Sequence, residues 1–163
     1  MLSNVTYQRL AGTNVLRDFV ELPSQLMEHW LSEPRVLREH ARHVVTNETI
    51  PEDMITKLFS ARNFNQGFAS VEYTACALVD QALHALPLED VKGLDLATFE
   101  QAQMARLGMP KGIVMRHRPS QFAHLFSGFS YASAYYVYLW AEVLDAGKPF
   151  FFNCLWPVLF ILF

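Results

Sequence analysis

The chain has 163 residues, of which 52% are hydrophobic, 18% charged and 13% aromatic. This composition predicts a folded chain with a single core and excludes a disordered polymer. The formal net charge of −3, with no basic run anywhere in the sequence, argues against nucleic acid as a partner.

The first helix is expected over residues 15–31, because apolar residues recur there at helical spacing, and Pro23 should bend it. Its apolar stripe would be Val15, Phe19, Leu22 and Leu26. Its opposite face would carry a polar row: Asp18, Glu21, Gln25 and Glu28. From periodicity alone, a row of this kind is typical of a solvated face.

The rest of the sequence predicts a mainly α fold. Further helices are expected over 33–44, 51–62, 64–86, 94–107 and 131–146. Loops or irregular segments would separate them at 46–49, 87–93 and 111–121, with a short strand considered at 113–115.

Two motifs carry the chemistry. The first is G-T-N-V-L-R-D-F-V-E-L-P-S-Q at 12–25. It resembles the helix that supplies the glutamate zinc ligand in the thimet oligopeptidase and peptidyl-dipeptidase family of zinc metallopeptidases. The resemblance assigns that ligand to Glu21, the last residue of D-F-V-E.

The second motif lies at 121–140 and contains Tyr131, Tyr135 and Tyr138, which would share one helical face. A tyrosine stripe usually packs with its hydroxyls at the surface, but its O–H groups could also stabilise an oxyanion. The segment resembles the same family, with the family's glycine-rich run reduced here to S-G-F-S. The resemblance implies that His124 and Tyr138 hydrogen-bond the reacting carbonyl, and that Tyr131 and Tyr135 bind and position the peptide.

The resemblance runs from about residue 9 to 145 and includes a connecting helix at 61–73. It implies the helical half of a zincin-like oligopeptidase catalytic domain. It also implies zinc as the cofactor of the intact enzyme and short peptides as its substrates.

The zinc-binding motif H-E-x-x-H, with two histidine ligands and a general base, is absent from the sequence. In the family it precedes the ligand glutamate by a distance that would place it before Met1. Because a catalytic zinc takes three protein ligands, we expect this chain alone neither to hold zinc nor to hydrolyse peptides. The alternative is a non-catalytic helical module that binds peptides or a partner, or self-associates through exposed apolar surface.

The sequence changes character after Ala146. Residues 149–163 carry no charge and hold five of the 13 phenylalanines. The run is shorter than the roughly 20 residues that a membrane-spanning helix needs, and Pro157 interrupts it, so membrane association is disfavoured. We therefore expect a fragment of a metallopeptidase catalytic domain at 1–146 and an apolar tail, frameshifted or non-native, at 147–163.

The remaining histidines and cysteines give weaker signals. His40 and His43 are spaced for a metal but are expected to be surface residues, and His29, His84 and His117 are expected to be structural or solvated. Cys76 should be a buried small hydrophobe. Two cysteines do not make a disulfide framework and no secretory signal is visible, which favours a cytoplasmic setting.

Overall fold

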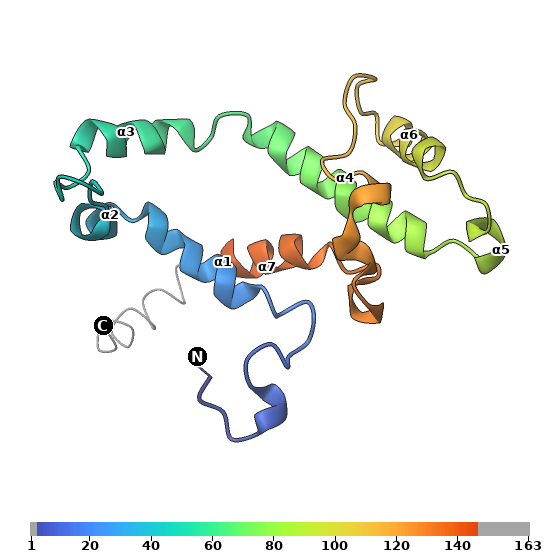
Figure 1. The fold of residues 1–163 in the computed structure, drawn as a ribbon, viewed down its shortest axis with the longest axis horizontal. Helices are drawn as coiled ribbons and strands as arrows, with labels where there is room; N and C mark the ends of the chain where they lie inside the picture. The colour runs from blue at the N-terminus through green and yellow to red at the C-terminus, as the bar shows by residue number, and fades with distance from the viewer. Residues whose placement is uncertain (1–2, 147–163) are drawn as a thin grey trace. The chain divides into compact units, whose positions relative to one another are not determined.

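The structure is a computed structural model that describes residues 3–146 as helices joined by turns and irregular segments (Figure 1). The mainly α prediction is confirmed, since the extended pairing within 3–146 is limited to one isolated bridge between Arg42 and Thr49. The chain forms two compact units: unit 1 combines Met1–Arg62 with Val137–Phe163, and unit 2 is Asn63–Tyr136. The predicted tail at 147–163 lies outside the described residues and stays a prediction.

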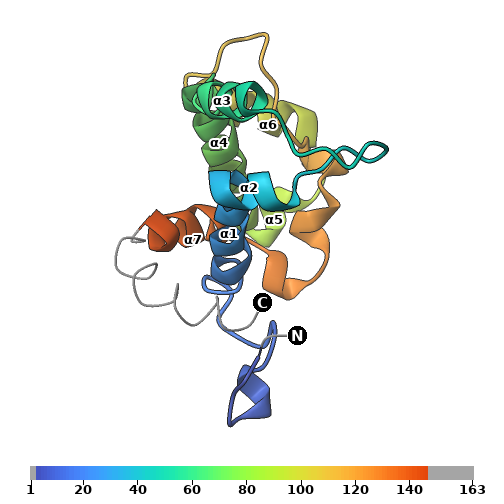
Figure 2. The same cartoon turned by 90° about the vertical axis from the view of Figure 1, so that its left-hand side faces the viewer.

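Unit 1 contains α-helices and short 3-10 helices from both ends of the chain. They are η1 (Gln8–Leu10), α1 (Leu22–Glu28), η2 (His29–Ser32), α2 (Pro34–His40), α3 (Glu52–Ala61) and α7 (Val137–Ala146). Figure 2 shows α1 beside α7, the pair with the most extensive contact between elements of this unit. Helix α3 matches its predicted range closely, whereas α2 ends at His40, earlier than expected.

The prediction of one helix over 15–31 with a bend at Pro23 is wrong. Residues 17–21 form turns, and α1 begins at Leu22 with Pro23 in its first turn. The backbone N–H groups of a first turn have no partner within the helix, so a proline costs nothing there and its fixed φ favours helix initiation. Pro23 therefore starts this helix instead of bending it.

Two polar contacts connect α1 to α7. The Nε2 of Gln25 donates a hydrogen bond to the carbonyl of Tyr138 at 3.1 Å. One helical turn later, the Nε2 of His29 lies 2.5 Å from Oδ2 of Asp145, whose side chain is buried. His29 is thus structural, as predicted, and both contacts fix the register of α1 against α7.

Unit 2 is built on the long helix α4. Its elements are α4 (Gln66–His84), α5 (Leu88–Val91), α6 (Leu96–Arg106), η3 (Pro119–Gln121), η4 (Ala123–Phe126) and η5 (Phe129–Tyr131). The predicted helices over 64–86 and 94–107 are confirmed. A short helix, α5, interrupts the predicted loop at 87–93, and no strand forms at 113–115 within this described segment.

The core of unit 2 lies between the second half of α4, α6 and the loop after α6. Its buried members are Ala75, Cys76, Val79, Met104 and Met115. All buried positions of α4 fall in its second half, from Ala75 onward. The prediction that Cys76 is a buried small hydrophobe is confirmed, since its exposure is 1%.

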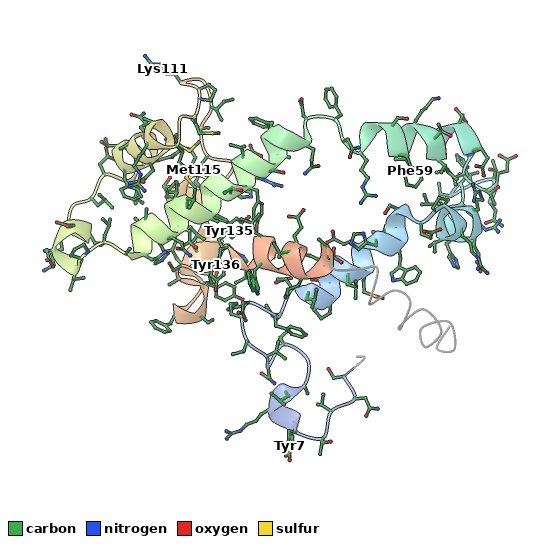
Figure 3. The ribbon with its side chains drawn as sticks, turned by 180° about the vertical axis from the view of Figure 1, so that it is seen from behind. Tyr7, Phe59, Lys111, Met115, Tyr135 and Tyr136 are labelled. Carbon is green, nitrogen blue, oxygen red and sulfur yellow. The ribbon has the colours of Figure 1, made fainter. Side chains whose placement is uncertain are left out.

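A buried carboxylate holds the loop after α6 in place. Glu100 of α6 is 2% exposed, and its Oε1 accepts the backbone N–H of Met115 at 3.1 Å. Its Oε2 accepts from Nε of Arg118 at 2.9 Å. Figure 3 shows Lys111 at the outer tip of this loop and Met115 on its inner limb. The irregular segment therefore has a defined path without secondary structure of its own.

We expect Glu100→Gln to lower the free energy of unfolding by about 1–3 kcal/mol. Glutamine has an NH₂ group in place of one carboxylate oxygen, and this donor would face the N–H of Met115 or of Arg118. Urea unfolding followed by circular dichroism measures the loss. The matched control is Glu89→Gln, at an exposed position of α5, which should stay within about 0.5 kcal/mol of the parent. Equal effects of the two substitutions would contradict the role of Glu100.

Burial raises the pKa of the Cys76 thiol, so the reactive thiolate is scarce in the folded unit. In a Cys154→Ser chain, we expect Cys76 to react with an aromatic disulfide reagent at least about 100-fold more slowly in buffer than in denaturing urea. Glutathione is the exposed-thiol control under both conditions. Rapid labelling of Cys76 in buffer would show that this core is not closed.

Candidate functional site

Glu21 occupies the N-cap position of α1 and is half-buried. Its Oε2 accepts a hydrogen bond from the hydroxyl of Ser24 at 3.0 Å, and that hydroxyl also lies 2.9 Å from the Glu21 carbonyl. The predicted polar face of Asp18, Glu21, Gln25 and Glu28 is wrong, because Asp18 lies in the turn before the helix. Glu21 is therefore held by the helix start and not by a place in a carboxylate row.

The structure brings His124, Tyr131 and Tyr135 together within unit 2. The His124 ring lies edge-on to Tyr131 with centroids 5.1 Å apart, and edge-on to Tyr135 with centroids 5.8 Å apart. The buried ring of Phe122 lies 4.9 Å from Tyr135 and supports the group from one side. We call His124, Tyr131 and Tyr135 the aromatic cluster.

The prediction that Tyr131, Tyr135 and Tyr138 share a helical face is wrong. Helix α7 begins only at Val137, and Tyr131 ends the short helix η5. Between them Ser133 has a φ of +59°, in the left-handed region that breaks a helix. The first two tyrosines, on either side of this turn, both contact His124, whereas Tyr138 lies in the first turn of α7, in unit 1.

Asp80 is the residue of this region that the sequence reasoning missed. It is completely buried in α4. Its Oδ1 accepts the N–H of Ser133 at 3.2 Å, and its Oδ2 accepts the N–H of Tyr135 at 2.9 Å. A single acidic residue in the apolar stretch A-C-A-L-V-D-Q-A-L was the available signal, since a buried charge requires partners.

Tyr135 is held from several directions. Its ring stacks on Tyr73 with centroids 5.0 Å apart, and the Tyr73 hydroxyl donates to the Tyr135 carbonyl at 3.3 Å. Burial raises the pKa of the Tyr135 phenol, with the Cys76 thiol as the second cause. The phenol thus stays protonated at neutral pH and keeps the O–H that a hydrogen-bond donor needs.

Unit 1 contains two of the five predicted site residues, Glu21 and Tyr138. The N–H of Gln25 donates to the Glu21 carbonyl at 3.0 Å, while the side chain of the same Gln25 donates to the Tyr138 carbonyl. Gln25 thus links the segment of the proposed zinc ligand to the segment of the proposed oxyanion donor. Unit 2 contains the other three residues, as the aromatic cluster.

The described part of the chain shows no metal centre. Across residues 3–146, no group of three or more histidine, cysteine, aspartate or glutamate side chains is arranged to hold a metal ion. His40 is exposed, with its Nε2 3.8 Å from Glu39, and the Nδ1 of His43 accepts the N–H groups of Val45 and Thr46. Over the same residues, no helix combines the length and apolarity required to cross a membrane.

The comparisons with known proteins agree on one family. The model of peptidase family M3 matches residues 1–151. A dipeptidyl carboxypeptidase from Salmonella typhimurium is 44% identical over 148 residues, covering 89% of this chain and 21% of the relative. An oligopeptidase A from Haemophilus influenzae is 35% identical over 147 residues, covering 90% and 21%. A mitochondrial intermediate peptidase from Saccharomyces cerevisiae is 34% identical over 147 residues, covering 88% and 18%.

The chain therefore spans about a fifth of the length of the curated relatives it matches. The matched region contains both motifs, D-F-V-E and the tyrosine segment, and all five residues singled out from them. With the family model covering nearly the whole sequence, the chain belongs to peptidase family M3.

Proposed function

We propose that this chain is the part of an M3 peptidase that binds a short peptide and stabilises the transition state of its hydrolysis. The aromatic cluster is the observation that carries the proposal. It gathers an imidazole and two phenols, groups that can donate hydrogen bonds to peptide carbonyls. Family membership supplies the reaction class, because the matched relatives are named as peptidases.

In this proposal, water attacks the carbonyl carbon of the scissile peptide bond, and the carbonyl oxygen becomes an oxyanion. His124 and Tyr138 donate hydrogen bonds to that oxygen as its charge develops. The C–N bond then breaks, and the leaving amine takes up the proton that the attacking water gives up. Tyr131 and Tyr135 hold the peptide backbone, so that the carbonyl meets its donors in a fixed orientation.

Zinc would supply the activated water in the intact enzyme. Glu21 suits one ligand position, because its half-buried carboxylate is oriented by Ser24. One carboxylate does not make a catalytic site, which takes three protein ligands. Among residues 3–146, no group of three side chains fits a complete zinc site, and we therefore assign this chain no metal-dependent step and no peptidase activity alone.

A second candidate function is a non-catalytic peptide-binding module. The contacts of the aromatic cluster described above all lie within unit 2, so they do not depend on Glu21. Such a module would bind peptides whether or not zinc is present. Reconstitution of peptidase activity, described below, separates the two functions.

The setting and self-association of the chain are further proposals. We retain a cytoplasmic setting from the sequence, although one matched relative is named as mitochondrial, so the family alone does not decide it. Large apolar side chains are exposed, among them Phe129 at 99%, Val44 at 95% and Phe64 at 80%. Side chains of this kind favour self-association.

We expect the purified 163-residue chain to leave a fluorogenic short peptide uncut, with or without added zinc, because it lacks H-E-x-x-H. Co-expression with the rest of the Salmonella typhimurium dipeptidyl carboxypeptidase, outside the matched segment, should yield zinc-dependent cleavage. In that complex Tyr138→Phe should lower kcat by about 10²–10³-fold, as for loss of an oxyanion donor. Zinc-dependent cleavage by the chain alone, lost in Glu21→Ala, would contradict the assignment.

We also expect the chain to bind a short peptide in a calorimetric titration, with the same affinity in the presence of a chelator. Tyr135→Phe should weaken binding by about 3- to 10-fold, because a hydrogen bond from the phenol is lost. The matched control is Tyr7→Phe, in the N-terminal segment, where Tyr7 is 71% exposed. If no peptide binds the parent chain, the proposed role of the cluster fails.

A further inference from the structure

The carboxylate of Asp80 accepts hydrogen bonds from residues outside its own helix. A buried carboxylate is strongly destabilising unless its oxygens are paired. Helix α4 satisfies its own backbone groups, so the two N–H groups that Asp80 accepts come from elsewhere, at Ser133 and Tyr135. The carboxylate therefore fixes the path of a segment more than fifty residues further along the chain.

His84 connects Asp80 to η4, the short helix that contains His124 of the aromatic cluster. It lies one helical turn after Asp80, with its Nδ1 2.7 Å from Oδ1 of Asp80 and 3.0 Å from the Asp80 carbonyl oxygen. The centroid of its ring is 5.6 Å from that of Phe126, the last residue of η4. His124 lies in the same short helix, so the Asp80–His84 pair contacts both segments that supply the cluster.

The turn at Ser133 depends on these contacts. A φ of +59° at Ser133 lies in the left-handed region, which is conformationally unfavourable for a residue with a side chain. Hydrogen bonds to a charged acceptor are stronger than neutral ones and can offset that cost. The backbone N–H of Tyr135 donates to Asp80, so it does not donate to the carbonyl of Tyr131 as it would in an α-helix. The ring of Tyr135 instead meets Tyr73 and His124.

We propose that Asp80, supported by His84, is a positioning residue for the aromatic cluster. It fixes the backbone at 133–135, and so sets the rings of Tyr131 and Tyr135 against His124, without touching the peptide itself. The consequence for peptide binding rests on the proposed function, whereas the positioning does not. Asparagine cannot replace Asp80, because it keeps one acceptor and turns an NH₂ donor toward a backbone N–H.

Amide hydrogen exchange by NMR on the full chain tests the positioning directly. In the parent, we expect the amides of Ser133 and Tyr135 to exchange at least about 10-fold more slowly than those of Ala132 and Ala134. The latter two form local turn bonds to the carbonyls of Phe129 and Tyr131. Equal exchange of the four amides would overturn the proposal, and this comparison decides it even where a variant fails to fold.

In Asp80→Asn, exchange at Ser133 and Tyr135 should accelerate by about 10- to 100-fold, the effect of losing a bond to a charged acceptor. The α4 amides and the far-ultraviolet circular dichroism should stay unchanged. The matched control is Glu100→Gln, the other buried carboxylate of unit 2, which should release the Met115 amide and leave Ser133 and Tyr135 protected. Unchanged exchange, or equal acceleration across unit 2, would show that Asp80 does not position this turn.

Peptide titration of the same variants separates this proposal from the proposed function. Asp80→Asn should weaken peptide binding by about 10-fold, whereas Glu100→Gln should not. If the exchange pattern is as expected but the parent binds no peptide, the positioning role stands and the peptide-binding function falls. If the parent binds peptide and Asp80→Asn binds equally well, the proposed positioning of the cluster is wrong.

Discussion

The requirement that a buried carboxylate be fully hydrogen-bonded determines the structure of unit 2. Asp80 and Glu100 are 0% and 2% exposed, and each accepts hydrogen bonds from a segment without regular secondary structure. The backbone N–H groups of those segments have no partner within a helix or sheet. The carboxylates need donors and these N–H groups need acceptors, so each satisfies the other. Helices α4 and α6 therefore hold the irregular segments at 115–118 and 133–135 through these two buried carboxylates.

Unit 1 is also held by polar contacts, here between two helices. Gln25 and His29 lie one turn apart on α1, and each contacts α7 through a polar atom. Apolar packing alone tolerates small shifts of one helix along another, whereas a hydrogen bond to one carbonyl fixes the register. Glu21 immediately precedes α1, and Tyr138 lies in the first turn of α7, so these contacts fix the backbones of both proposed site residues within one unit.

The sequence predicted well those helices whose ends are determined by residues near them in the sequence. For α3, α4 and α6, apolar periodicity gave ranges within about two residues of those observed. It failed at 15–21 and 131–136, where periodicity suggested helix. Helix α1 begins only at Leu22, with Pro23 in its first turn, and Asp80 fixes the backbone at 133–135. Pro23 was visible and was assigned the wrong effect. The effect of Asp80 could not be seen, because its partners are more than fifty residues away.

This failure bears on how the tyrosine motif should be interpreted. The spacing of Tyr131, Tyr135 and Tyr138 pointed correctly to the family, but the geometric reason offered for it, one helical face, does not hold. Two of the tyrosines contact His124 because Asp80, which lies outside the motif, accepts the backbone N–H groups of Ser133 and Tyr135. A motif can thus name the residues of a site while their arrangement depends on residues that it does not include. In this chain, a substitution of Asp80, in the second half of α4, should therefore change the arrangement of the aromatic cluster although the residue lies outside the motif.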